Sequence, residues 1–191
     1  MIQLKRPLIL ASKSPRRQFL LKEANIPFVV KTKSIAETFP SHLELSEVAA
    51  YIAKDKAEAA AVFLEDETDT LLTADSVVAC GNHFLAKPED AEDAKRMLRI
   101  LSGTMHYVYT GVCIKSKNKE EVFTGTSKVY MNKLSEEEID FYIKQYRPYD
   151  KAGSYAIQEW IGLCKISKIE GTYANIMGLP VDLVYKCLLD W

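Results

Sequence analysis

The sequence lacks the features of a secreted protein, of a protein with a structural zinc site and of a membrane-spanning protein. Its four cysteines are scattered and form no C-x-x-C pair, so they indicate small buried side chains and neither a zinc site nor a disulfide framework. No apolar run approaches the roughly 18 residues of a membrane span. The N-terminal stretch turns basic too early for a signal peptide. We therefore expect a cytoplasmic chain with no membrane partner.

An excess of charge of one sign is also missing. Lysine and arginine together number 25, aspartate and glutamate 26, and the net charge is −1. A protein that binds nucleic acid through its phosphate backbone usually presents a broad basic face, so we expect no nucleic-acid partner and only local basic sites. A chain of 191 residues can bury a normal core, and we expect one domain over residues 1–191.

Short strands and helices alternate along the chain, which predicts the α/β class, with a mixed twisted sheet and flanking helices. Polar residues that favour helix starts support the helices, notably Ser14 before Pro15, Asp90, and the capping box of Ser135 with Glu138. Strands are expected at 8–11, 27–31, 70–80, 83–86, 105–115, 122–132 and 161–169, and helices at 14–24, 46–64, 90–101, 135–146 and from 180 onward. Gly81-Asn82 is expected to form the turn between the strands at 70–80 and 83–86, and the buried residues of the first helix are expected to include Phe19, Leu20 and Leu21.

The segment 8–21 combines a strand, a hydroxyl-bearing loop and a helix start. Free N–H groups at a helix N-terminus favour an anion, and Ser12 can add a hydroxyl. Arg16 and Arg17 can add forked, charge-assisted hydrogen bonds to phosphate oxygens. The alternative is a capped helix with solvated arginines. The G-x-x-x-x-G-K-[ST] pattern of a P-loop is absent.

An aspartate interrupts the apolar strand LLTADSVVAC. A carboxylate in such a run is costly to bury without a partner, so Asp75 is expected to meet a cation or to lie at an opening of the sheet. It is a candidate metal ligand or a base that activates water. The alternative is a carboxylate satisfied by a nearby backbone group or lysine.

Four further charged residues are candidates for the same chemistry. Lys87 follows the short return strand and could serve as a point charge for phosphate, although an exposed lysine is the usual case. Lys54 and Lys56 lie two positions apart on one helix and point to different faces, so at most one would enter a site. Glu37 could be a second carboxylate for a hard divalent cation, or a solvated loop residue.

The segment DKAGSYAIQ at 150–158 is rich in small residues, which let backbone approach a ligand closely. It ends at Gln158, whose amide carries both a donor and an acceptor and suits the reading of a nucleobase edge. As chemistry alone, this segment is only suggestive.

Taken in order, these strings resemble the Maf family of nucleoside triphosphate pyrophosphatases over nearly the whole chain. The matching strings are LASKSPRR at 10–17, AKDKA at 53–57, TADSVV at 73–78, AKP at 86–88, LSGTMHYVYTGV at 101–112, DKAGSYAIQ at 150–158 and IEGTYANIMGLP at 169–180. The resemblance implies a fold like that of inosine-triphosphate pyrophosphatases, with two lobes around a nucleotide cleft. It also implies hydrolysis of a nucleoside triphosphate to the monophosphate and pyrophosphate, with a divalent cation, Mg²⁺ or Mn²⁺.

The resemblance also assigns roles. Asp75 matches the family's proton acceptor, and with Glu37 it would hold the metal. Positions that match substrate-binding residues are Ser12, Arg16, Arg17, Lys56, Ser76, Lys87 and Gln158, and among them Arg16, Ser76 and Gln158 match positions tied to substrate choice. The AIQ ending resembles the branch that acts on dTTP and UTP more than the branch that acts on 7-methyl-GTP. Ser76 stands where threonine is expected, and Glu159-Trp160 replaces small residues that commonly follow the glutamine.

Two alternatives from other classes stay open at this point. A nucleotide sensor without catalysis, acting in cell division, would share the phosphate site and need no base. A nucleic-acid-binding protein would use Arg16 and Arg17, against the near-neutral charge. A homodimer is compatible with the sequence.

Overall fold

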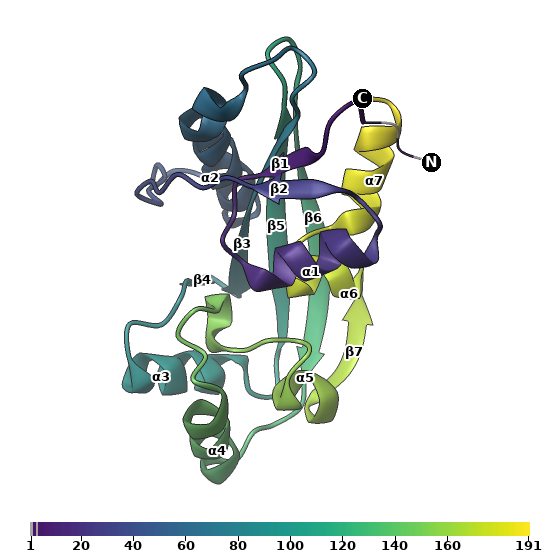
Figure 1. Cartoon of the computed structure of the whole chain (residues 1–191). Helices are drawn as coiled ribbons and strands as arrows, with labels where there is room; N and C mark the ends of the chain where they lie inside the picture. Colours follow the sequence, from purple (N-terminus) through teal and green to yellow (C-terminus); the bar gives the residue numbers. More distant parts are fainter. Residues whose placement is uncertain (1, 3) are drawn as a thin grey trace. The chain divides into compact units, whose positions relative to one another are not determined.

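The structure is a computed structural model that describes residues 2 and 4–191. Strands and helices alternate as the sequence predicts (Figure 1). The strands are β1 (Leu8–Leu10), β2 (Phe28–Val30), β3 (Leu71–Cys80), β4 (His83–Leu85), β5 (Met105–Lys115), β6 (Glu120–Met131) and β7 (Ile166–Glu170). The α-helices are α1 (Pro15–Glu23), α2 (Leu45–Ala60), α3 (Ala91–Leu101), α4 (Glu136–Tyr146), α5 (Trp160–Cys164), α6 (Tyr173–Met177) and α7 (Val181–Leu189), and the 3₁₀ helices are η1 (Ala61–Phe63) and η2 (Ala152–Ser154).

The strands form one seven-stranded sheet in the order β2-β1-β3-β5-β6-β7, with β4 paired to β3. β1 pairs in parallel with both β2 and β3, whereas the pairs β3–β4 and β6–β7 are antiparallel. β5 and β6 are joined by only four residues, a connection that permits only an antiparallel pair. The sheet is therefore mixed, which confirms the predicted α/β class.

The chain divides into two compact units. Unit 1 consists of Met1–Asp75, Thr110–Gly125 and Gly178–Trp191, and unit 2 of Ser76–Tyr109 and Thr126–Met177. The boundaries fall inside β3, β5 and β6, so both units draw on these three strands. The single domain expected from the sequence stays a prediction.

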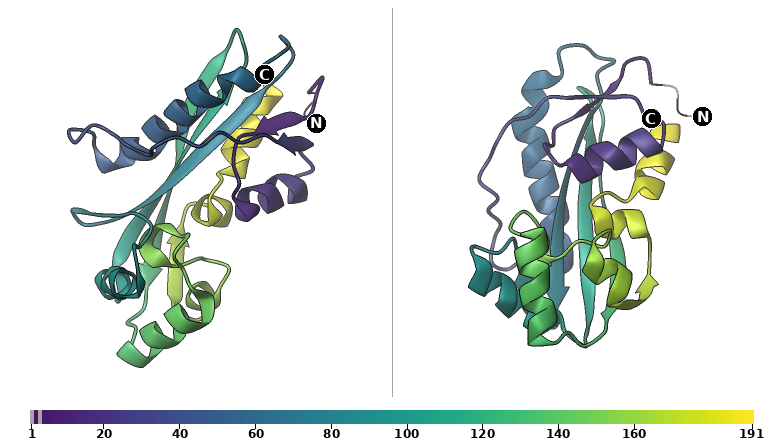
Figure 2. Two further views of the ribbon diagram at one scale, coloured as in Figure 1. Left: turned by 60° about the vertical axis from the view of Figure 1, so that its left-hand side comes forward. Right: turned by 60° about the horizontal axis from the view of Figure 1, so that its bottom comes forward.

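In unit 1, helix α2 lies on one side of the strands, and α1 and α7 lie on the other (Figure 2). One buried cluster of this unit joins α2 to β1, β3 and β5 and consists of Ile9, Ala53, Ala57, Ala60, Leu64, Leu71 and Cys113. The alanines of α2 permit this close packing, and Thr73 Oγ1 donates to the Ala53 carbonyl at 2.6 Å. The odd-numbered side chains of this part of β3 therefore face α2.

Gly111 on β5 packs directly against the backbone of α2. A Cβ atom at this position would lie 2.2 Å from the Ala49 carbonyl carbon and 2.2 Å from the Ala50 nitrogen. Only glycine permits this approach, which brings the helix that carries Lys56 onto the sheet.

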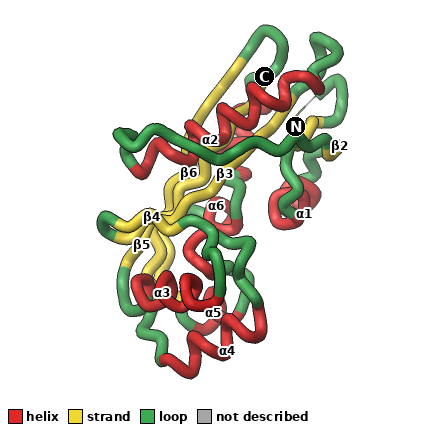
Figure 3. The backbone as a smooth tube through the Cα atoms, turned by 90° about the vertical axis from the view of Figure 1, so that its left-hand side faces the viewer, coloured by secondary structure: helices red, strands yellow, loops and turns green. Residues whose placement is uncertain are grey.

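Unit 2 has its own core, built from β3 to β6 with α3, α4 and α5. Its largest fully buried side chains include Leu98, Leu101, Ile139, Tyr142 and Ile161. Figure 3 shows α3, α4 and α5 gathered with the loop that joins α4 to α5, the segment that carries Gln158.

The predicted helix caps of this unit are confirmed. The Asp90 side chain accepts a hydrogen bond from the Asp93 N–H at 2.8 Å, and Ser135 with Glu138 forms both bonds of a capping box. The hairpin expected at Gly81 is also present, with Val78 to Cys80 on one strand paired to His83 to Leu85 on the other.

Three sequence-based predictions are wrong. The strand expected at 161–169 begins as helix α5, and β7 starts only at Ile166. Phe19, expected in the core, is 51% exposed, because Leu20 and Leu21 take the buried face of α1 and three consecutive helical residues cannot share it. All four cysteines are free, and Cys80 and Cys113 are buried as expected, but Cys164 is exposed and Cys187 is only half-buried.

His106 of β5 is a buried histidine that is expected to make stability depend on pH. It is fully buried, its Nε2 lies 2.7 Å from the Tyr155 hydroxyl, and burial lowers its pKa to about 4 from 6.5. Between these values the unfolded chain takes up a proton that the folded protein excludes. Stability is therefore expected to fall by about 3 kcal/mol as the pH drops from about 6.5 to about 4.

Urea unfolding of the wild type and of His106→Gln at both ends of this pH range measures the effect. The glutamine cannot titrate, so the variant should lose less stability on acidification than the wild type does. Equal losses in the two proteins would contradict the assignment to His106.

Candidate active site

Lys56 is the centre of a group of charges in unit 1. Its ammonium Nζ lies 2.6 Å from Asp75 Oδ1 and 2.6 Å from Glu37 Oε1. The lysine and aspartate side chains are 17% and 11% exposed, so water screens this pair only weakly. α2 presents Lys56, the middle of β3 presents Asp75, and the loop after β2 presents Glu37. Asp75 therefore meets a cation, and that cation is a lysine, the partner that the alternative named. Its roles as metal ligand and base stay predictions.

The structure also separates the two lysines of α2. Lys56 binds Asp75 and Glu37, whereas Lys54 pairs with Glu120 of β6 at 3.0 Å. Two positions on a helix differ by about 200° in direction, which is why only one of the two enters the site.

Ser12 and Arg17 form the second part of this group. Arg17 Nη1 donates to Ser12 Oγ at 3.2 Å, and Arg17 Nε donates to the Gly178 carbonyl at 2.8 Å. Ser12 Oγ also accepts from the Ser14 N–H at 3.2 Å. Arg17 thus joins the loop before α1 to Gly178, the residue that follows α6.

Arg17 is electrostatically coupled to the acids. Burial lowers the pKa of its guanidinium, the Asp75 carboxylate opposes that shift, and Glu37 opposes it more weakly. Arg16, with its like charge, lowers the same pKa. All six of these predicted residues belong to unit 1: Ser12, Arg16, Arg17, Glu37, Lys56 and Asp75. Lys56 contacts Asp75 directly, Arg17 interacts with it electrostatically, and Ser12 contacts Arg17.

The start of α1 differs in one detail from its prediction. Ser14 is the N-cap and Pro15 the first helical residue, as expected, but the Ser14 side chain makes no capping hydrogen bond. Ser12 accepts the Ser14 N–H in its place, so its hydroxyl organises the loop.

Asp75 and Glu37 are the only predicted metal ligands. Among residues 2 and 4–191, no group of three or more His, Cys, Asp or Glu side chains is placed to hold an ion. The two carboxylates, both already gathered around one cationic nitrogen, fit a hard divalent cation whose other ligands are water and substrate phosphate, as is usual for Mg²⁺.

The remaining predicted residues, Ser76, Lys87 and Gln158, belong to unit 2. Ser76 follows Asp75 on β3 and points to the opposite face, because side chains alternate along a strand. The segments of Lys87 and Gln158 lie together, since the Gly153 N–H donates to the Ala86 carbonyl at 3.2 Å. Gln158 Oε1 is buried and has no hydrogen-bond partner in the described part of the chain.

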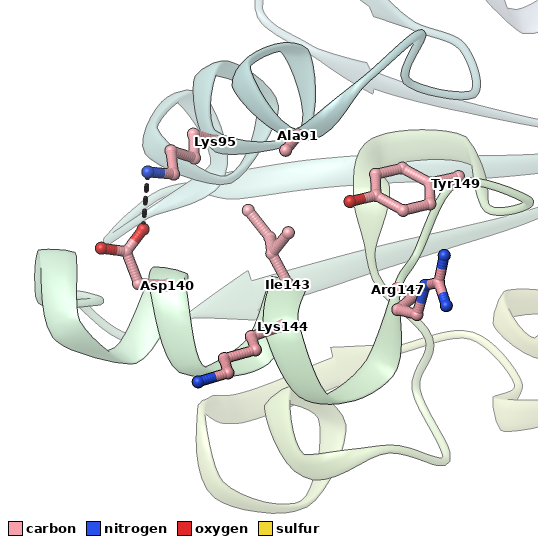
Figure 4. A pocket seen from close by; sticks show the side chains of 7 residues that line it. All are labelled: Ala91, Lys95, Asp140, Ile143, Lys144, Arg147 and Tyr149. Carbon is pink, nitrogen blue, oxygen red and sulfur yellow. Dashed lines mark ion pairs between the residues drawn. The ribbon is translucent and has the colours of Figure 1, made fainter.

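A cavity of about 540 Å³ opens elsewhere in unit 2, between α3, α4 and the loop after α4 (Figure 4). Its lining includes Lys95, paired with Asp140 at 2.8 Å, and the side chains of Ala91, Ile143, Lys144, Arg147 and Tyr149. No predicted site residue lines it, so this cavity does not coincide with the candidate chemistry.

No helix in the described part of the chain is both long and apolar enough to cross a membrane.

Comparison with known proteins identifies the family. Residues 7–191 match the family described as Maf-like protein. A dTTP/UTP pyrophosphatase of Porphyromonas gingivalis (strain W83) is 48% identical over 187 residues, covering 96% of this chain and 94% of that protein. A dTTP/UTP pyrophosphatase of Flavobacterium psychrophilum is 46% identical over 185 residues, covering 96% and 93%.

A solved structure of the Staphylococcus aureus Ham1 protein matches with a TM-score of 0.45 and 16% identity, covering 66% of this chain and 72% of that one. This likeness is too low to carry an argument. The family match and the two relatives cover nearly the whole chain, and the chain therefore belongs to the Maf-like protein family.

Proposed function

We propose that this protein is a nucleoside triphosphate pyrophosphatase that hydrolyses dTTP and UTP, and related modified pyrimidine nucleotides, to the monophosphate and pyrophosphate. The observation that carries the proposal is the Lys56 ammonium held at 2.6 Å from both Asp75 and Glu37, with Arg17 coupled to the same acids. The relatives described above, which are named for this activity, support the choice of substrate.

The basic groups have the chemistry to bind the triphosphate. Ser12, Arg16, Arg17, Lys56 and Lys87 supply hydroxyl, guanidinium and ammonium donors, which bind phosphate oxygens and stabilise charge that develops in the transition state. We assign Ser12, Arg16, Arg17 and Lys56 to the triphosphate because all four belong to unit 1. We assign Lys87 to it because of its sequence motif, AKP at 86–88.

Asp75 and Glu37 would hold a divalent cation, Mg²⁺ or Mn²⁺. When bound, such a cation neutralises phosphate charge and polarises the phosphoryl group.

Asp75 is suited to activate water. Lys56 holds Asp75 Oδ1 and fixes the carboxylate, while Oδ2 accepts no hydrogen bond from the described residues. In the proposed step, Asp75 takes a proton from water as the water oxygen bonds to the α-phosphorus. The bond from that phosphorus to the bridging oxygen breaks, its electron pair leaves with pyrophosphate, and the nucleoside monophosphate remains.

Gln158 is assigned to the base. A uracil or thymine ring presents an imide N–H donor beside carbonyl acceptors. The amide of Gln158 can accept from that N–H through Oε1, which is buried and unpaired in the structure, and can donate through Nε2. Arg16 and Ser76 are the other two residues that we associate with substrate choice.

A panel of nucleoside triphosphates, assayed separately for pyrophosphate and orthophosphate, tests the proposal. With Mg²⁺ or Mn²⁺ we expect pyrophosphate from dTTP and UTP. A chelator should lower the rate by about 100-fold or more, and excess Mg²⁺ or Mn²⁺ should restore it.

Two results would contradict this function. Orthophosphate as the first product would exclude attack at the α-phosphorus. Tight binding across the panel without turnover would instead favour a non-catalytic nucleotide-binding regulator.

A further inference from the structure

The loop that carries Gln158 contains an unusual backbone conformation. Gly153 and Ser154 are consecutive residues in the left-handed region, with φ of 69° and 60°. For serine this region costs about 1 kcal/mol or more, so neighbouring groups must hold the loop in place.

Two contacts hold the middle of this loop. The Ser154 hydroxyl lies 3.2 Å from the Met97 sulfur, and the Tyr155 hydroxyl lies 2.7 Å from His106 Nε2. Both reach residues of unit 2 that lie far away in sequence. Neither contact involves Gln158 or its immediate neighbours.

A buried polar network holds the end of the loop. The Tyr142 hydroxyl of α4 accepts the Ala156 N–H at 3.0 Å and donates to Glu159 Oε2. Lys151 Nζ lies 3.4 Å from Glu159 Oε1 and 2.7 Å from Asp150 Oδ1. The Glu159 carboxylate therefore joins Tyr142 of α4 to Lys151 near the start of the loop, and Tyr142 in turn holds Ala156 near its end.

The burial of this network makes it sensitive to the loss of one member. Tyr142 is fully buried, and the side chains of Lys151 and Glu159 are 9% and 18% exposed. Burial raises the pKa of Tyr142, as does its hydrogen bond to Glu159, so its hydroxyl stays protonated and remains a donor. Removing one partner would leave a buried charge or hydroxyl unpaired, which costs more than the hydrogen bond itself stabilises.

Gln158 lies between the two residues that this network fixes, Ala156 and Glu159. Its Oε1 is buried without a partner in the described residues, which is the condition of an acceptor kept for a ligand. The contacts of the Glu159 side chain restrain the backbone after Gln158. The hydrogen bond of the Ala156 N–H restrains the backbone before it.

We infer that Glu159 is a positioning residue for nucleobase choice: with Tyr142 and Lys151 it holds the loop 150–158 so that Gln158 presents its amide to a pyrimidine imide. This inference rests on the proposed function. Glu159 does not touch the reacting phosphate and takes no part in the proposed proton transfer.

Three variants test the inference. Glu159→Ala removes the carboxylate, Glu159→Gln keeps an acceptor for the Tyr142 hydroxyl but loses the charge that faces Lys151, and Tyr142→Phe removes the hydroxyl alone. Glu137→Ala is the matched control, because it removes an exposed carboxylate from the same helix α4.

Hydrogen exchange of the nucleotide-free protein gives the first readout. We expect Glu159→Ala and Tyr142→Phe to speed exchange of amides in 152–158 by about tenfold or more, with Glu159→Gln intermediate and Glu137→Ala unchanged.

Steady-state kinetics give the second readout. The ratio of kcat/KM for UTP to that for GTP should fall about fivefold or more in Glu159→Ala and Tyr142→Phe, through a raised KM for UTP, while kcat stays within about threefold. Glu159→Gln should recover part of the ratio, which a general loss of folding would not allow.

The two readouts separate the inference from the function. Hydrogen exchange can be measured whether or not the protein is active. If the variants exchange faster but the wild type releases no pyrophosphate from UTP, the proposed function is overturned, and with it the role of Glu159 in base choice. The restraint of the loop by this network would still stand. Unchanged exchange, or an unchanged UTP-to-GTP ratio with faster exchange, would overturn the inference while the proposed function stands.

Discussion

Replacement of Asp75 by asparagine should reduce kcat for UTP by about 10²- to 10⁴-fold, the usual contribution of a positioned general base. Asparagine has nearly the same shape and can still accept from Lys56 Nζ, now 2.6 Å from Asp75 Oδ1. It cannot take a proton from water, and it is a poorer ligand for a divalent cation. The loss should therefore appear in kcat with the fold intact.

Asp55→Asn is the matched control for this measurement. It makes the same chemical change one residue from Lys56 on α2, and should leave kcat within about twofold because Asp55 has no role in the proposed chemistry. Thermal melting of both variants verifies that they are folded. Asp75→Asn with near wild-type turnover would remove Asp75 from the mechanism.

Gly111→Ala should be among the most destabilising single-methyl changes in unit 1. The added Cβ would meet the α2 backbone at 2.2 Å, and backbone, unlike a flexible side chain, cannot move aside cheaply. We expect a loss of about 3 kcal/mol or more, equivalent to a fall in Tm of about 6–12 °C for a chain of this size. The same displacement of α2 should weaken activity, since α2 carries Lys56.

Gly81→Ala gives the comparison for Gly111. At Gly81 an added Cβ meets nothing within 4 Å, and the cost is confined to its left-handed φ of 55°. That change should cost only about 1 kcal/mol. Similar Tm values for the two variants would show that the close approach of β5 to α2 does not govern stability.

The parts of the fold that were predictable from sequence are those set by local chemistry. Asp90 and Ser135 begin helices because their side chains satisfy N–H groups a few residues away, and Gly81 permits a tight turn. The long strands β5 and β6 were also predictable, because polar and apolar residues alternate along them.

The errors came where packing decides between two conformations or two faces that the sequence pattern allows. Residues 160–164 form a helix although their apolar run suggests a strand, and Gly162 there packs so closely on Ile157 that an added Cβ would lie 1.7 Å from its carbonyl oxygen. Phe19 lies outside because its two neighbours occupy the buried face of α1. The sequence did not show which of the three consecutive apolar residues of α1 would be left outside, or that the apolar run at 160–164 would pack as a helix.

The candidate site shows the same division. The unusual cost of an aspartate in an apolar strand predicted a cationic partner for Asp75, and helix geometry limited the choice to one of Lys54 and Lys56. Helix geometry could not place Glu37 beside Lys56, because a loop brings it there. Glu159 stood out in the sequence as a departure from the family pattern, but nothing in the sequence placed it beside Tyr142 and Lys151. These three residues come together only through the packing of α4 on the following loop.

The central claim, attack of water on the α-phosphorus of a pyrimidine triphosphate, is tested most directly by hydrolysis of UTP in ¹⁸O-labelled water with Mg²⁺. Mass spectrometry of the products then locates the label. The account requires one labelled oxygen in the UMP phosphate and unlabelled pyrophosphate. Label in pyrophosphate or in orthophosphate, with unlabelled nucleotide, would contradict it.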